Sequence, residues 1–289
     1  MILFSLVVAI RRSLTTRTFS VDWEHPTTPA KGADFIALLA ALRHWLPEPG
    51  YLLTTALPVG TYCLGHVDLA RAGGLVDMLN LMGYDFCGPW SAHAGHQSQL
   101  RDRPAVPPRP SEHLLAKLGI QQRCGPRRQQ QQQQREENAG RKPTTAKSCA
   151  AGVEYVLAQG FPPEKVVLGV PTYGYAFAGA RRPGDGFSRA TTVENGHLDE
   201  TTWAAAQVDE GGIGAAWAVE DGNDNHHHDD DDDNNTCSFT SFDVPATVRA
   251  KARYVREKHL GGLFYWHVFA DCTSEDKSLI KAGKEALEC

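Results

Sequence analysis

The sequence predicts an α/β fold in which helices cover a parallel sheet. Segments with the apolar pattern of buried strands alternate with segments whose apolar residues recur at helical spacing. With 289 residues, 42% of them hydrophobic, the chain is long enough to bury a large core. Because strands and helices alternate, the strands are expected to run parallel. We count five such strands, centred near Val21, Leu52, Leu79, Val167 and Phe264.

The first strand, helix and strand follow directly from these patterns. The strand is predicted over Ser20 to Glu24 and ends at His25-Pro26, since proline cannot donate to a strand ladder. Residues 33–45 place their apolar side chains on one helical face, and Pro47 stops this helix. Residues 51–57 form a nearly continuous apolar run, which is typical of a buried parallel strand.

The alternation continues along the rest of the chain. A short helix is expected over 67–72, with Gly73-Gly74 as its terminator. The remaining segments have the same two periodicities. They predict strands over 76–84, 165–171 and 261–268, and helices over 146–159, 244–259 and 274–288.

Three regions break this pattern. Residues 102–147 combine a proline-rich stretch with glutamine and arginine runs, and we expect a disordered surface insertion there. Residues 223–235 form a second low-complexity insertion, rich in His, Asp and Asn, which is expected to be solvated rather than metal-binding. Residues 176–219 interrupt the alternation without low complexity.

The first strand carries a pair of acids. If residues 20–24 are extended, Ser20, Asp22 and Glu24 share one face, with alpha carbons two apart separated by roughly 6.6 Å. Two carboxyls that close raise one pKa, so a protonated acid stands beside an ionised partner. Glycosidic bond cleavage needs this arrangement. A solvated sheet edge is the alternative interpretation.

Four segments in a fixed order resemble glycoside hydrolase family 18, the chitinases. Val21-Asp22-Trp23-Glu24 resembles the end of the family signature D-G-x-D-x-D-W-E, and residues 80–86 resemble N-L-M-x-Y-D-x. Residues 166–174 are similar to the later L-G-x-P-x-Y-G strand, and residues 262–266 to the final G-x-x-x-W strand. The resemblance is to fungal-type members and runs from about residue 20 to the C-terminus.

The resemblance implies a (β/α)8 TIM barrel from which about the first three strands are absent. Residues 20–289 would then be a partial catalytic domain, with a small α+β insertion after the seventh strand, for which 187–217 is the candidate. Five strands cannot close such a barrel. Residues 1–19 do not match the signature; they are interpreted as a weak signal-like segment or a mispredicted exon.

The resemblance also implies roles for individual residues. Glu24 matches the general acid, and Asp22 would orient the substrate acetamide that attacks its own anomeric carbon in substrate-assisted retaining catalysis. Tyr84 and Asp85 would hold the same acetamide. Met82 would line the pocket floor, although core packing is equally compatible with it. Trp266 would stack on a sugar ring.

Two positions depart from the family signature. Ser20 stands where the family has the aspartate two residues before Asp22, and Arg17 stands where the first aspartate would be. Without a carboxylate at residue 20, Asp22 loses one influence that raises its pKa. The sequence therefore predicts weaker catalysis than the intact signature would support.

The composition limits which classes of partner and cofactor the chain is expected to bind. The five consecutive aspartates 229–233 account for the net charge of −5, so nothing indicates nucleic acid binding. The seven cysteines show no C-x-x-C spacing, and the implied chemistry needs no metal or organic cofactor. The apolar run 1–10 is too short to span a membrane. Its positive charges follow rather than precede it, which argues against a secretion signal, although the resemblance implies an extracellular protein.

Three hypotheses about function remain open from the sequence. The first is an endo-acting chitinase, or part of one, that hydrolyses the β-1,4-linked N-acetylglucosamine of chitin or chito-oligosaccharides, as a monomer if the barrel is complete. The second is a chitin-binding relative with impaired catalysis. The third is a nonfunctional truncated product. Retention of Glu24 and Asp22 favours the first.

Overall fold

A parallel five-stranded sheet forms the centre of the molecule. The computed structural model describes residues 17–102, 148–209, 212–220 and 237–288. The strands lie in the order β1-β2-β3-β4-β10, and every neighbouring pair is parallel. They are β1 (Arg17–Asp22), β2 (Tyr51–Pro58), β3 (Met78–Met82), β4 (Val166–Pro171) and β10 (Gly262–Trp266). The five predicted strands are therefore confirmed.

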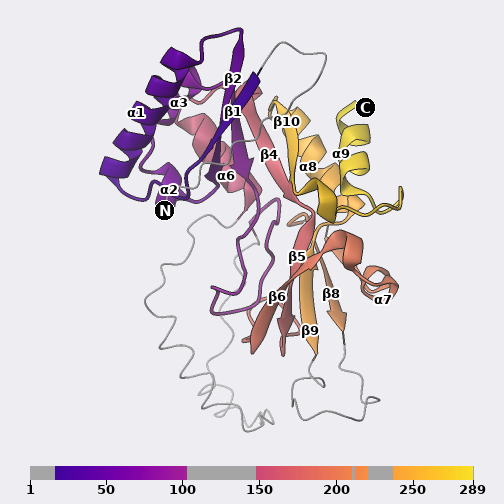
Figure 1. Ribbon diagram of the computed structural model, residues 1–289. Helices are drawn as coiled ribbons and strands as arrows, with labels where there is room; N and C mark the ends of the chain where they lie inside the picture. The colour runs from indigo at the N-terminus through magenta and orange to yellow at the C-terminus, as the bar shows by residue number, and fades with distance from the viewer. Residues whose placement is uncertain (1–16, 103–147, 210–211, 221–236, 289) are drawn as a thin grey trace.

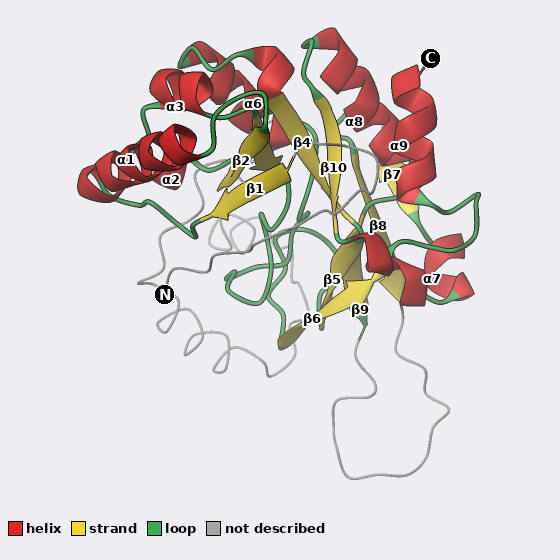
Figure 2. Ribbon diagram, turned by 45° about the horizontal axis from the view of Figure 1, so that its top comes forward, coloured by secondary structure: helices red, strands yellow, loops and turns green. Residues whose placement is uncertain are grey.

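Helices cover one side of this sheet (Figures 1 and 2). A large cluster of buried side chains, including Val21 and Leu53 from the strands and Phe35 from the first helix, fills the space between the two layers. The helices are α1 (Pro29–Trp45), α2 (Thr61–Leu64), α3 (Leu69–Leu75), α6 (Cys149–Ala158), α8 (Pro245–Glu257) and α9 (Leu279–Glu288). Short 3-10 turns cover Pro163–Lys165, Asn195–His197 and Val268–Ala270.

The sheet is of the TIM-barrel type but does not close. Among the described residues, β1 pairs with β2 alone and β10 pairs with β4 alone, which leaves two edges open. Strand β4, in the interior of the sheet, is buried along its whole length, whereas β10 is partly exposed. This matches the expectation that five strands cannot complete the barrel.

A second, antiparallel sheet is inserted between β4 and α8. It comprises β5 (Tyr173–Ala178), β6 (Arg189–Glu194), β7 (Gln207–Asp209), β8 (Ala215–Glu220) and β9 (Ser238–Phe242), in the order β6-β5-β9-β8-β7, with the short helix α7 (Glu200–Ala204). Figure 1 shows it below the carboxyl ends of β4 and β10. The expected α+β insertion is therefore present, but it is larger than residues 187–217. Long-range pairing of β5 with β9, which local periodicity does not report, accounts for the difference.

Several sequence-based expectations fall mainly on residues that the structure leaves undescribed. These are the interpretation of residues 1–19, of which only the start of β1 is described, and the two low-complexity insertions 102–147 and 223–235. Several predictions within the described part need correction. Gly73-Gly74 does not terminate the short helix, because α3 runs from Leu69 to Leu75 and includes both glycines. The last helix begins at Leu279 rather than at residue 274. Helix α2 was not predicted, because four residues are too few for a helical period. The strand predicted over 20–24 already ends at Asp22.

Local sequence explains how α1 is placed. Thr28 caps the helix by accepting from the Lys31 backbone N–H at 3.3 Å, and Pro29 suits the first helical position. At the other end Arg43 donates to Asp77 Oδ2 at 2.5 Å, which ties the helix to the segment before β3. This end of α1 is thus fixed to the sheet by a charged hydrogen bond as well as by apolar packing.

Gly32 is where α1 approaches the rest of the chain most closely. A Cβ atom at this residue would lie 1.7 Å from the backbone oxygen of His66. Gly32→Ala is therefore expected to lower the free energy of unfolding by about 1–3 kcal/mol, as overpacking does. Gly74→Ala is the matched control, because a Cβ at this helical glycine meets nothing within 4 Å and is expected to be neutral or stabilising. Equal midpoints in urea unfolding would contradict the expectation.

Candidate active site

The acid pair lies at the carboxyl end of β1. Asp22 is the last residue of the strand and Glu24 lies two residues beyond it, so the prediction that strand alternation places both on one face is wrong. The charge of Glu24 nevertheless acts on Asp22. Burial raises the pKa of Asp22, and the charge of Glu24 raises that pKa further. Asp22 Oδ1 is buried without a hydrogen-bond partner among the described residues.

Tyr84 and Asp85 come from the segment that follows β3. The sheet register aligns Asp22 with Ala56 and Pro58 with Met82, so the ends of β1, β2 and β3 meet at one edge. Asp85 has a φ of 63°, in the left-handed region. Its Oδ1 accepts hydrogen bonds from two phenols, Tyr173 at 2.6 Å and Tyr175 at 3.1 Å. The insertion therefore contributes side chains to this site.

Gln97 holds the backbone at Asp85 in place through hydrogen bonds. This fully buried amide donates from Nε2 to the carbonyl of Tyr173 at 2.5 Å, and its Oε1 accepts from the Asp85 N–H at 3.4 Å. The Gln97 carbonyl also accepts from the Phe86 N–H at 3.0 Å. One side chain thus connects the loop after β3 to the first strand of the insertion.

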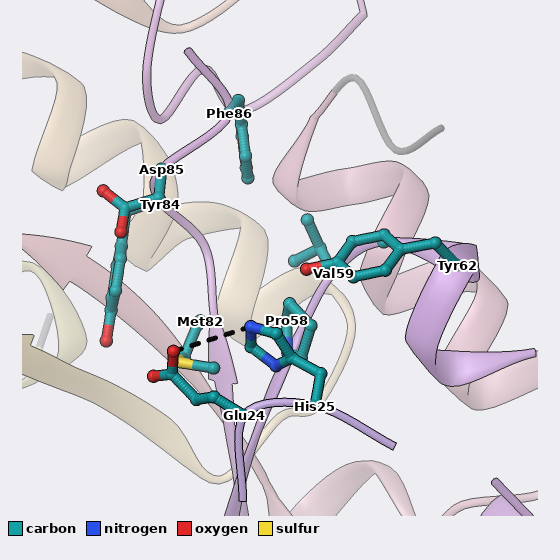
Figure 3. A pocket seen from close by; sticks show the side chains of 10 residues that line it. Glu24, His25, Pro58, Val59, Tyr62, Met82, Tyr84, Asp85 and Phe86 are labelled. Atoms are coloured by element: carbon teal, nitrogen blue, oxygen red, sulfur yellow. Dashed lines mark ion pairs between the residues drawn. The ribbon is translucent and has the colours of Figure 1, made fainter. Parts of the chain in front are cut away.

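A cavity next to Glu24 joins these elements. Its volume is about 80 Å³, and it opens to solvent. In Figure 3 the Glu24 carboxyl lies among the lining side chains. The lining residues are Glu24, His25, Pro58, Val59, Gly60, Tyr62, Met82, Tyr84, Asp85 and Phe86.

The electrostatics favour protonated acids in this cavity. Burial raises the pKa of Glu24, and the charge of Asp85 raises it further, although the Glu24 side chain is 56% exposed. Burial also raises the pKa of Asp85, while its two tyrosine donors lower it. Burial raises the pKa of Tyr62 to about 12 and raises the pKa of Tyr84 well above its usual range, so both phenols stay protonated. The site therefore combines a proton donor with hydrogen-bonding hydroxyls.

His25 forms the wall beside Glu24. Its Nε2 lies 3.6 Å from Glu24 Oε2, shown by the dashed line in Figure 3. The imidazole packs edge-on against Tyr62, with ring centroids 5.8 Å apart. Burial lowers the pKa of His25, and the charge of Asp22 opposes that shift.

The structure brings five of the six predicted site residues together. Glu24, Met82, Tyr84 and Asp85 line the cavity, and Asp22 is close enough to interact with Glu24. Trp266 does not line it; this side chain is 51% exposed at the end of β10. Its role as a sugar platform stays a prediction.

Sequence reasoning missed several residues of this site. Tyr173 and Tyr175 alternate in β5, so period-two patterning could have placed them on one face. Tyr62 gave no signal, because it lies in the unpredicted helix α2. Trp90 meets Tyr175 at an interplanar angle of 84° and is 38% exposed. Trp23 contacts Phe35, with ring centroids 6.2 Å apart.

The described part of the chain offers no alternative metal centre. In it, no group of three or more His, Cys, Asp or Glu side chains is arranged to hold a metal ion. Nor does any described helix have the length and apolar character that a bilayer span requires.

Carboxyls at the strand ends of an α/β barrel-type sheet are an arrangement that glycoside hydrolases use. The family model for glycosyl hydrolases family 18 matches residues 4–271, so the chain belongs to that family. The match begins within residues 1–19, which do not match the family signature motif.

Individual relatives agree with this assignment. The chain is 26% identical over 282 residues to chitinase A1 of Niallia circulans, covering 91% of this chain and 36% of the relative. It is 26% identical over 278 residues to chitinase 1 of Aphanocladium album, covering 92% and 55%. The chain thus spans between about a third and about half of the length of these curated relatives.

Solved structures agree on the fold. The Group IV chitinase of Ostrinia furnacalis superposes with a TM-score of 0.67 at 20% identity, covering 93% of this chain and 68% of that one. A mutant class V chitinase of Nicotiana tobaccum in complex with NAG4 gives a TM-score of 0.64 at 21% identity, with 93% and 68% covered.

Proposed function

We propose that this chain carries a chitinase site that hydrolyses β-1,4-N-acetylglucosamine linkages. The observation that supports this most is the convergence of three carboxyls, Asp22, Glu24 and Asp85, from the ends of β1 and β3, with raised pKa values for all three. The relatives named as chitinases, and a related structure holding NAG4, support the same substrate class.

In the proposed mechanism Glu24 acts as the general acid. It gives its proton to the glycosidic oxygen, and the leaving sugar departs. The acetamide oxygen of the substrate attacks the anomeric carbon from the opposite face, so the ring retains its configuration after water attacks in turn. Glu24, now a carboxylate, takes a proton from that water. No enzyme nucleophile, metal or organic cofactor enters this scheme.

The other residues are proposed to hold the acetamide. Asp22 would orient it and stabilise the positive charge that develops, while the Tyr84 hydroxyl and the Asp85 carboxyl would hydrogen-bond to it. Met82 would form the floor of the pocket, and Trp266 would offer a flat face to a sugar ring. Catalysis would belong to residues 20–289, acting outside the cell on chitin or its oligosaccharides, as a monomer if the barrel is complete.

A chitin-binding relative with impaired catalysis is the second candidate. Ser20, whose position in the family carries an aspartate, leaves Asp22 without the neighbouring carboxyl that would share its charge. Asp22 Oδ1 also lacks a partner among the described residues. Both observations favour weakened catalysis, in which Tyr84 and Asp85 would still hold the sugar.

Hydrolysis of paired fluorogenic substrates tests the proposal. A β-chitobioside is expected to be cleaved, and a β-cellobioside is expected to resist cleavage because it has no acetamide to act as nucleophile. Thermal unfolding by circular dichroism is followed on the same sample. Binding of chito-oligosaccharide without cleavage would favour the second candidate. The absence of both a cooperative transition and any binding would instead favour the nonfunctional product.

A further inference from the structure

His25 has a geometry that the proposed mechanism does not use. It follows Glu24 directly, and its Nε2 lies 3.6 Å from Glu24 Oε2. Its ring and that of Tyr62 meet edge to face at an interplanar angle of 88°, and its side chain is 24% exposed. In Figure 3 the imidazole stands between the Glu24 carboxyl and the Tyr62 ring. Its orientation toward Glu24 is thus fixed by packing.

The environment of the other ring nitrogen selects one protonation state. His25 Nδ1 is buried and has no hydrogen-bond partner among the described residues. An imidazolium carries a proton on both nitrogens, so charging the ring would leave a buried N–H unpaired. The neutral tautomer with its proton on Nε2 avoids this. Its N–H then lies on the nitrogen that is 3.6 Å from Glu24 Oε2, a distance at which the attraction is electrostatic rather than a hydrogen bond. Burial lowers the pKa of His25, which agrees with the neutral form.

We propose that His25 is a positioning residue that holds the Glu24 carboxyl and limits the pH range over which Glu24 keeps its proton. An N–H directed at a carboxyl oxygen stabilises the carboxylate more than the acid. A protonated imidazole would do so more strongly. Both forms of His25 therefore act in the same direction, against the influence of burial and Asp85. This inference rests on the proposed role of Glu24.

The groups around the pair come from three elements. The end of β1 supplies Asp22, whose pKa is raised by burial and by the charge of Glu24, with a smaller opposing contribution from His25. Helix α2 supplies Tyr62, which stays neutral because burial raises its pKa to about 12. The segment after β3 supplies Tyr84 and Asp85, of which Asp85 raises the pKa of Glu24. His25 is therefore the one potential cation among these named groups.

Carbon-13 NMR titration of labelled glutamate carboxyls tests the proposal without requiring turnover. The Glu24 signal is assigned by its loss in Glu24→Gln. In His25→Phe the titration midpoint of Glu24 is expected to rise by roughly 0.5–1 pH unit, because an aromatic ring without a donor replaces the imidazole. His25→Gln retains an N–H donor and is expected to give a smaller rise. His44→Phe, at an exposed histidine of α1, is the matched control and is expected to leave the midpoint unchanged.

A reciprocal measurement keeps the test decisive if His25→Phe does not fold. Nitrogen-15 NMR of the His25 ring is expected to report the Nε2–H tautomer, and Glu24→Gln is expected to lower the titration midpoint of His25. An unchanged His25 midpoint in that variant, or an unchanged or lower Glu24 midpoint in His25→Phe, would overturn the proposal.

The activity profile separates this inference from the proposed function. If the chain hydrolyses the chitobioside, the alkaline limb of kcat/KM in His25→Phe is expected to move upward together with the NMR midpoint. Hydrolysis that depends on Glu24 without any NMR coupling would overturn the role of His25 alone. Coupling in a chain without hydrolysis would support the contact between the two residues and overturn the proposed function.

Discussion

Replacing Glu24 with glutamine is expected to lower chitobioside hydrolysis by about 10²–10⁴-fold, the usual contribution of a general acid. Glutamine keeps the shape of the side chain but has no proton to give to the leaving oxygen. Because the Glu24 side chain is 56% exposed, the thermal midpoint is expected to change little. Initial rates and a circular dichroism melt on the same preparations measure both quantities.

The pH dependence follows from the same residue. Burial and Asp85 raise the pKa of Glu24 above its usual 4.5, so the folded chain keeps this proton at pH values where an exposed glutamate has lost it. Hydrolysis is then expected to fall as pH rises through that raised value. Asp85→Asn removes one of the two causes and is expected to move the alkaline limb toward lower pH.

The matched control for Glu24→Gln is Glu154→Gln on α6. Its carboxyl is 61% exposed and accepts from Lys258 Nζ at 3.1 Å, so its surroundings resemble those of Glu24 in exposure but not in position. Rates within a factor of about two of the parent are expected for this variant, since surface substitutions have small effects. Substantial hydrolysis by Glu24→Gln would show that another group supplies the proton.

The strands of the parallel sheet and the first helix could be predicted from the sequence because their apolar patterns are local. Residues 51–57 form one apolar run, and the observed β2 exceeds that run by a single residue. Helix α1 shows its apolar stripe in the sequence, and the structure buries Phe35 and Leu39 of it, whereas Trp45 at the end of the stripe is 78% exposed. Periodicity works in such cases because each segment buries one face against a continuous layer.

The residues of the site were harder to predict from the sequence, because segments far apart in the chain form it. Tyr173 and Tyr175 reach Asp85 only because β5 lies beside the loop after β3, and the sequence does not report that pairing. The position of Glu24 was predicted by extending strand alternation past Asp22, where the strand ends. The acids converge even so, because parallel strands in register deliver their carboxyl ends to one edge. Topology, rather than alternation, brings the acids together.

Distant segments are also joined by a buried network around Lys251, so substitutions of this residue test the fold most directly. Its side chain on α8 is fully buried, and Nζ lies 2.6 Å from Asp243 Oδ2 and 3.3 Å from Ser98 Oγ. Ser98 also donates to Asp243 at 2.6 Å, and Thr247 donates to its other oxygen at 2.6 Å. This network joins α8, the end of the insertion and the loop that carries Gln97.

Lys251→Met is therefore expected to lower the free energy of unfolding by about 3–5 kcal/mol, because it leaves the Asp243 charge buried without its cation. Urea unfolding measures the change. Lys284→Met is the matched control: its pair with Glu288 is 4.0 Å long and more than half exposed on both sides, so a loss of about 0.5 kcal/mol or less is expected. The double variant Asp243→Asn with Lys251→Met removes both charges and is expected to recover part of the loss.

The consequence for the site distinguishes this network from ordinary core packing. Ser98 follows Gln97, which holds the backbone of Asp85 and the carbonyl of Tyr173. Loss of the Lys251 contact is thus expected to loosen the Asp85 loop, so hydrolysis by Lys251→Met should fall even at temperatures where the chain remains folded. An unfolding midpoint equal to that of Lys284→Met would mean that the buried pair contributes no more than a surface pair, and that the loop is held by its apolar contacts instead.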